Sequence, residues 1–211
     1  MSLEDFYYTI ASPLRAPDLK IKGSRFIADI IPVETKEGVE HCLANIRKEF
    51  HDATHHSFAY RLGAGALLVR AADDGEPAGT AGKPILLVLT SRKLTNVLLV
   101  VTRFFGGTKL GTGGLARAYA EAAQQAVSMS KIVKAYLTKT VQLEVHYEDL
   151  PSMERLIHVF EGHIQESNYL TSVSLTIAIR ESKLEPFLAA VMDSFHGRVR
   201  LDSIEGISTP H

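Results

Sequence analysis

The chain has 211 residues and a net charge of −1, with 45% hydrophobic and 22% charged residues. This composition is typical of a globular protein with one or two domains, and it excludes disordered, collagen-like and coiled-coil chains. The charge is uneven: residues 1–136 carry 17 basic and 13 acidic side chains, whereas residues 137–211 carry 6 and 11. The mildly basic first part therefore permits an anionic partner.

Neither a secretory signal nor a membrane helix is expected. The first residues carry two acids and no basic segment before an apolar run. The longest apolar stretches, 85–89 and 97–101, are about a quarter of the roughly 20 residues that a membrane helix needs. The one cysteine, Cys42, excludes a disulfide framework and fits a reducing compartment. We therefore expect a cytoplasmic protein without a membrane partner.

The first part of the chain predicts an α+β domain over residues 1–136. Thr35 is expected to cap a helix, because apolar residues recur at helical spacing from Val39 to Phe50. Residues 131–136 are the predicted linker. The other expected elements are strands at 6–10, 24–33, 57–62 and 66–70, with a hairpin at Gly63–Gly65, a helix from about Pro84, a buried strand at 96–102 and a helix at 115–130.

The second part, residues 137–211, predicts the order βαββαβ. Apolar residues alternate along 141–145 and 173–179, as in half-buried strands. Asp149 can cap one helix, and the capping box Ser182–Glu185 is expected to open another. A short strand at 163–166, a turn at 167–168 and a last strand at 198–204 complete a ferredoxin-like domain, an antiparallel sheet covered on one face by two helices. The fold class is therefore α+β with two domains.

Ten of the 15 glycines lie between Gly63 and Gly114, mostly in two segments, 73–84 and 103–114. Long loops in a compact domain are usually functional. The second segment joins a buried strand to the start of a helix, where free N–H groups and the helix dipole favour an anion. The alternative is a turn that only lets the helix pack closely on the sheet. The expected anion-binding residues are Arg103, Gly106, Gly107, Lys109, Gly111, Thr112, Gly113, Gly114 and Arg117.

The first segment brings three acids, Asp73, Asp74 and Glu76, after the histidine pair His55 and His56. Carboxylates with imidazoles are candidates for acid–base catalysis or for holding a divalent metal. The alternative is that the acids form turns and cap a helix. Their spacing matches no metal motif, so we expect neither a metal nor a cofactor.

Residues 73–82 and 103–115 resemble the signatures of the IMPACT family, in its YigZ-type bacterial branch. Residues 22–26 and 51–61 resemble two further blocks of that family in the same order, and residues 137–206 resemble its bacterial C-terminal domain. The resemblance implies an N-terminal α/β sandwich similar to the second domain of a small-subunit ribosomal protein. It also implies a ferredoxin-like C-terminal domain similar to the last domain of elongation factor G.

The resemblance further implies a link to translational control, since eukaryotic members bind the activator of a kinase that phosphorylates an initiation factor. That kinase role is not expected here, because this chain carries an acidic ferredoxin-like domain instead of the eukaryotic N-terminal one. We expect a regulatory binding protein that contacts RNA or the ribosome through its second glycine-rich segment.

Two alternatives stay open. One is an enzyme that holds a phosphate-bearing substrate on the second segment and uses the acids and histidines for catalysis. The other is a protein–protein adaptor that uses Phe104 and Phe105 as anchors.

Overall fold

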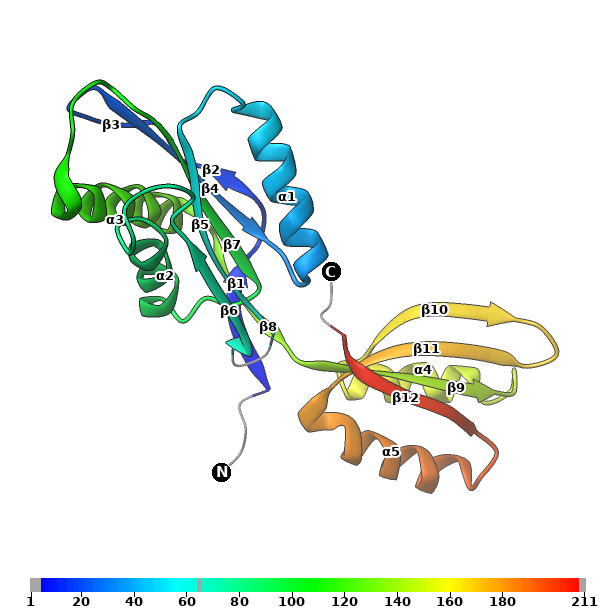
Figure 1. The fold of residues 1–211 in the computed structure, drawn as a ribbon. Helices are drawn as coiled ribbons and strands as arrows, with labels where there is room; N and C mark the ends of the chain where they lie inside the picture. Colours follow the sequence, from blue (N-terminus) through cyan, green and yellow to red (C-terminus); the bar gives the residue numbers. More distant parts are fainter. Residues whose placement is uncertain (1–4, 64–65, 209–211) are drawn as a thin grey trace. The chain divides into compact units, whose positions relative to one another are not determined.

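The structure is a computed structural model that describes residues 5–63 and 66–208. The chain divides into two compact units, one of which comprises Tyr7–Lys134 while the other is built around Ala135–His211. Figure 1 shows an α/β layer arrangement in the first unit and a single sheet with two helices in the second. Of the helices described, none is long and apolar enough to cross a membrane. The expected hairpin at Gly63–Gly65 lies partly outside the described residues.

The first unit is centred on an antiparallel sheet of six strands, ordered β2-β4-β7-β5-β6, with β3 also pairing β4. Its central strand β7 is buried on both faces. Val97, Leu99 and Val101 belong to one core, whereas Leu98 and Val100 belong to another. The strands are β2 (Leu14–Arg15), β3 (Leu19–Ile21), β4 (Ser24–Pro32), β5 (His55–Leu62), β6 (Leu68–Ala72) and β7 (Val97–Phe104).

Three helices cover this sheet. Helices α2 (Gly82–Ser91) and α3 (Gly111–Met129) pack on one face, and α1 (Lys36–Glu49) packs on the other. The predicted cap of α1 is confirmed, since Thr35 Oγ1 accepts a hydrogen bond from Gly38 N at 3.1 Å. Cys42 is half-buried on this helix, and burial raises the pKa of its thiol.

One predicted helix boundary is wrong, and the predicted linker, which contains the division between the two units after Lys134, is regular structure. Helix α3 begins at Gly111 instead of Leu115, so four residues expected in the loop form its first turn. Glycine has a low helix propensity, and packing of the following helix on the sheet outweighs it. The predicted linker 131–136 is mostly a strand, β8 (Ile132–Tyr136), which pairs with β1 (Phe6–Ile10).

The second unit is ferredoxin-like, as expected. Its antiparallel sheet has the order β10-β11-β9-β12, and both helices contribute to one core on one face. The elements are β9 (Thr138–Val145), α4 (Leu150–Val159), β10 (His163–Tyr169), β11 (Val173–Arg180), α5 (Glu181–Phe195) and β12 (Arg200–Ser208).

Three local predictions in this unit need correction. Strand β10 continues to Tyr169, so the predicted turn at 167–168 lies three residues later. Helix α5 begins at Glu181, and the Ser182 hydroxyl bonds the Asp5 carboxylate instead of capping the helix. Asp149 precedes α4 as predicted, but its carboxylate pairs with Arg198 at 3.0 Å and caps no N–H. In the last two cases a residue distant in sequence supplies the competing partner.

Candidate functional site

The two glycine-rich segments meet at a buried ion pair between Glu76 and Arg103. The Arg103 guanidinium donates to Glu76 Oε1 at 2.6 Å, and the two side chains are 6% and 3% exposed. Tyr119, on α3, donates its hydroxyl to the same oxygen at 2.7 Å. Burial raises the pKa of Tyr119, which keeps the phenol protonated as a donor. One carboxylate therefore ties the first segment to the end of β7 and to α3.

Side chains from two other strands complete this cluster. Ser24, at the start of β4, accepts from Arg103 at 3.2 Å. His55, at the start of β5, places Nε2 3.8 Å from Glu76 Oε1. The cluster is thus built by all four sequence blocks that carry the family resemblance, residues 22–26, 51–61, 73–82 and 103–115.

Asp73 caps helix α2. Its carboxylate accepts from the backbone N–H groups of Gly79, Ala81 and Gly82 at 2.8, 3.0 and 2.9 Å. Burial acts to raise the pKa of Asp73, but these three bonds outweigh it and the net pKa is lowered. Asp73 therefore follows the capping alternative, and it closes the N-terminus of α2 to other anions.

Asp74 fixes the turn between β6 and α2. It adopts a left-handed backbone conformation with φ 50°, and its Oδ2 accepts from the backbone of His56 at 2.7 Å. Arg47 on α1 pairs with its Oδ1 at 3.0 Å. Within the described part of the chain, no three His, Cys, Asp or Glu side chains converge as a metal ion would require. All three acids of the first segment therefore make structural contacts within this unit.

The two histidines occupy different environments. His55 lies next to the buried ion pair, and its Nδ1 is 2.8 Å from the Asp74 carbonyl oxygen. His56 is 8% exposed, and burial lowers its pKa. Its Nε2 is buried with no partner among the residues described. His55 beside Glu76 is the arrangement here that comes nearest to an acid–base pair.

The start of the second segment is anchored to the sheet. The Phe105 N–H donates to Thr54 Oγ1 at 3.1 Å, and the Gly106 N–H donates to Ser24 Oγ at 3.2 Å. A Cβ on Gly106 would lie 1.8 Å from the Gly23 carbonyl carbon, so only glycine allows this approach. Gly106 therefore has a structural role, although the contact it allows is with the turn before β4 and not with a helix. The anchoring residues Ser24, Thr54 and Tyr119 are absent from the sequence-based site, because a serine, a threonine and a tyrosine on an apolar stripe carry no signal of their own.

The rest of the second segment is open to solvent. A Cβ on Gly107, Gly111 or Gly113 would meet no atom within 4 Å. Gly107 and Gly111 have φ of 83° and 71°, which favours glycine for the backbone conformation alone. Gly113 has neither a positive φ nor a close neighbour, so no contact in the described structure accounts for its missing side chain.

The first N–H groups of α3 have no side-chain acceptor among the described residues, in contrast to those of α2, which donate to Asp73. No side chain of residues 5–63 or 66–208 caps α3, and its first turn holds no acid. Lys109, Thr112 and Arg117 are exposed at this end. No ion pair involves Lys109 or Arg117 within the described structure. Free N–H groups with two unneutralised cations form a favourable environment for an anion.

Arg103 is the clear correction to the predicted anion-binding set. It was expected to face an anion, but it is 5% exposed and its charge is matched by Glu76. Gly106 is exposed but leaves no room for a side chain, because a Cβ there would meet the Gly23 backbone. A Cβ on Gly114 would lie 3.2 Å from the Leu110 Cβ. Apart from Gly106, the exposed members of the set are Gly107, Lys109, Gly111, Thr112, Gly113 and Arg117.

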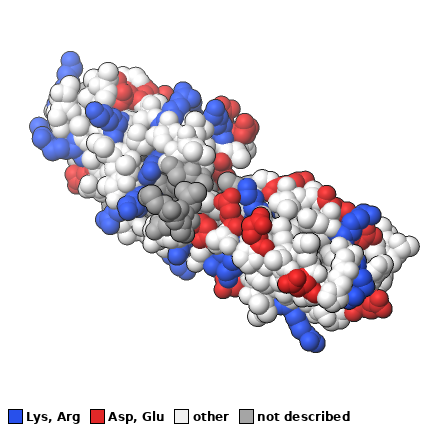
Figure 2. Space-filling view, turned by 90° about the horizontal axis from the view of Figure 1, so that it is seen from below, with Lys and Arg blue, Asp and Glu red and all other residues white. Residues whose placement is uncertain are grey.

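The charge distribution is dispersed. Figure 2 shows Lys and Arg singly and in small groups on the visible face of the Tyr7–Lys134 unit, and acidic groups interspersed on the other unit. On that face the described residues form no continuous basic stripe. The described residues on this face therefore offer no extended basic track for a phosphate backbone.

Comparison with known proteins identifies the family. Residues 22–127 match the model of the Impact N-terminal domain, and residues 143–198 match a domain of unknown function, DUF1949. The chain is 35% identical over 188 residues to the IMPACT family member YigZ of Escherichia coli, covering 88% of this chain and 92% of YigZ. The chain belongs to the IMPACT family.

Two further comparisons agree with this membership. An IMPACT family member of Thermus thermophilus is 43% identical over 182 residues, which cover 85% of this chain and 97% of the relative. A solved structure titled as that of a hypothetical protein is 33% identical, with a TM-score of 0.72 over 96% of this chain and 99% of that one. The predicted family and two-domain α+β fold are therefore confirmed.

Proposed function

We propose that this IMPACT family protein is a regulatory binding protein in translation that contacts the phosphate backbone of RNA through the start of α3. The observation that carries the proposal is the contrast between two neighbouring helices. Asp73 closes the N-terminus of α2 by accepting hydrogen bonds from Ala81 and Gly82, whereas α3 begins with exposed glycines and no described side-chain cap. A phosphate at α3 would take the position that the Asp73 carboxylate takes at α2.

The family membership supports the link to translation, since the sequence resemblance implies translational control for IMPACT proteins. Lys109 and Arg117 supply the positive charge. Gly113 supplies the close approach, because a side chain there would stand between a phosphate and the helix N–H groups.

The test is binding of a short single-stranded RNA, measured by fluorescence anisotropy at about 50 and 200 mM salt. Two phosphate contacts predict that the wild-type affinity falls about sevenfold over this range, with a slope of about −1.4 in log K against log salt. Lys109→Ala/Arg117→Ala is expected to remove most of the binding and flatten that slope. The matched control Lys48→Ala/Arg70→Ala, which removes two exposed cations elsewhere on the same unit, should behave as wild type.

Gly113→Ala separates binding from folding. Alanine in a helix is more stable than glycine by about 0.5–1 kcal/mol, so this variant should unfold no more readily than wild type. Its RNA affinity should nevertheless fall. RNA binding that survives both Gly113→Ala and Lys109→Ala/Arg117→Ala contradicts the proposal.

The two other functions have less structural support. The acids required by the enzyme hypothesis are engaged in capping α2, in fixing a turn and in the buried ion pair. For the adaptor hypothesis, Phe105 is 48% exposed, but Phe104 packs against Phe50 and the Arg25 guanidinium. Loss of partner binding in Phe105→Ala, with RNA binding unchanged, would favour the adaptor.

A further inference from the structure

A groove runs along the surface between α2 and α3, starting at the proposed anion site. Its near half has a volume of about 470 Å³ and extends from Arg117 and Ala116 over Pro84 and Leu87. Its far half, of about 830 Å³, extends to Arg92 at the end of α2. The two halves are adjacent, since Val88, Ser91 and Gln124 line both of them.

The helices run in the same direction along this groove. Pro84 faces Ala116 in the near half, and Arg92 shares the far half with Ser128, so later residues of α2 meet later residues of α3. Both N-termini therefore lie at the near end, and the groove leads away from the α3 N-terminus. From Arg117 to Ser128 it follows 11 residues of helix, or about 16 Å at 1.5 Å per residue.

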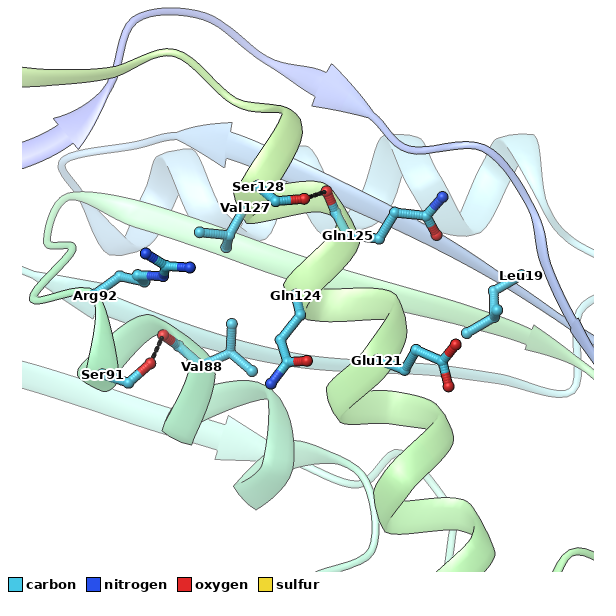
Figure 3. A pocket seen from close by; sticks show the side chains of 9 residues that line it. All are labelled: Leu19, Val88, Ser91, Arg92, Glu121, Gln124, Gln125, Val127 and Ser128. Atoms are coloured by element: carbon cyan, nitrogen blue, oxygen red, sulfur yellow. Dashed lines mark hydrogen bonds between the residues drawn. The ribbon is translucent and has the colours of Figure 1, made fainter.

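The far half is lined by several polar side chains, two of which have no partner within the described residues. The side chains of Gln124 and Arg92 make no hydrogen bond or ion pair within the described residues, and both residues are exposed. Figure 3 shows Gln124 reaching from α3 toward α2, and Arg92 extending toward Val127 on the same side of the groove. The one acid of the lining, Glu121, instead points toward Leu19 of β3.

These groups match the chemistry of a nucleic-acid strand. An arginine at each end can contact phosphates, and a glutamine amide can both donate to and accept from a base edge. The near half offers an apolar floor, with Leu87 58% exposed, on which a base can lie. A partner protein would be expected to place a large apolar anchor in the groove, but six of the nine residues that line the far half are polar or charged.

We infer that the α2–α3 groove carries single-stranded RNA onward from the α3 N-terminus, with Gln124 and Arg92 contacting the nucleotides beyond the first phosphates. This inference rests on the proposed function, since the strand enters at the Arg117 end. At about 3.4 Å per stacked nucleotide, 16 Å of groove accommodates about five nucleotides, or fewer in an extended strand.

The test compares oligouridylates of about four and about ten nucleotides by fluorescence anisotropy at one salt concentration. Wild type should bind the longer strand about tenfold more tightly, after correction for the larger number of binding registers, as two added hydrogen bonds predict. Arg92→Ala/Gln124→Ala should lose this gain and bind the short strand normally. The control Asn45→Ala/Arg70→Ala, with one exposed amide and one exposed cation of the same unit that do not line the groove, should keep it.

The outcomes separate the two proposals. If neither strand binds wild type, or if Lys109→Ala/Arg117→Ala binds the short strand normally, the proposed function fails. If the short strand binds but the longer strand gains nothing, or gains equally in Arg92→Ala/Gln124→Ala, the groove does not carry RNA. Either of these two results is also expected if the groove binds a protein partner.

Discussion

Replacing Glu76 by glutamine tests whether the buried ion pair holds the two glycine-rich segments together. The substitution keeps the shape of the side chain and an oxygen that can accept from Tyr119, but it leaves the Arg103 charge without its counter-ion. Removing one partner of a buried pair costs about 3–5 kcal/mol, and the retained hydrogen bond offsets about 1 kcal/mol. Since the two side chains are only 3% and 6% exposed, we expect a loss of about 3 kcal/mol in the free energy of unfolding.

The assay is urea unfolding of the full chain, followed by amide NMR signals that report each unit separately. Separate signals are needed because the chain has two compact units and one transition cannot be assumed. With a denaturant dependence of about 2 kcal/mol per molar urea, the midpoint of the Tyr7–Lys134 unit should fall by about 1.5 M. The midpoint of the other unit should stay where it is.

Two further variants make the result specific. Glu40→Gln, on the exposed surface of α1, should leave both midpoints unchanged. Glu76→Gln/Arg103→Met removes the unpaired charge as well, so its loss of stability should be smaller than the sum of the two single losses. A midpoint for Glu76→Gln within about 0.3 M of wild type would refute the reasoning.

Three other predictions follow from the same site. Gly106→Ala forces a Cβ to within 1.8 Å of the Gly23 carbonyl carbon and should destabilise the first unit by about 3 kcal/mol in urea. The lowered pKa of Asp73 means that its stabilisation is complete above its ordinary pKa of 3.8 and is lost as the pH falls through the folded value; Asp73→Asn should reduce the acid sensitivity of stability, and an unchanged acid profile would exclude the cap. The lowered pKa of His56 means that stability falls as the pH drops from its ordinary 6.5 toward the folded value; calorimetry of His56→Gln should show a smaller decrease over that window.

Much of the fold follows from local patterns in the sequence. Alternating apolar residues along 141–145 and 173–179 require strands with one buried face, and their order with the intervening helices gives the ferredoxin-like domain. The stripe from Val39 to Ile46, with its Thr35 cap, similarly gives α1. In these elements the local preference and the burial of one face agree, so a neighbour distant in sequence changes little.

Other features depend on residues far apart in the chain. The strand at 132–136 looks like a linker until β1 supplies its partner, and Ser182 looks like a cap until Asp5 takes its hydroxyl. The glycines at 111–114 likewise look like a loop, because glycine signals flexibility whether or not packing carries the helix through it.

The sequence alone drew attention to the two glycine-rich segments, whose Glu76 and Arg103 meet in the buried cluster, but it gave no sign of Ser24, Thr54 or Tyr119. Only the tertiary structure assigned the roles, because a charged side chain is either a ligand for an anion or a partner for a buried acid, depending on what folds against it. Arg103 lies in the same segment as Lys109. Arg103 is nevertheless buried in an ion pair with Glu76, 27 residues away in the chain, while Lys109 stays exposed. Burial and pairing are set by contacts across the sheet, and these contacts leave no local pattern in the sequence.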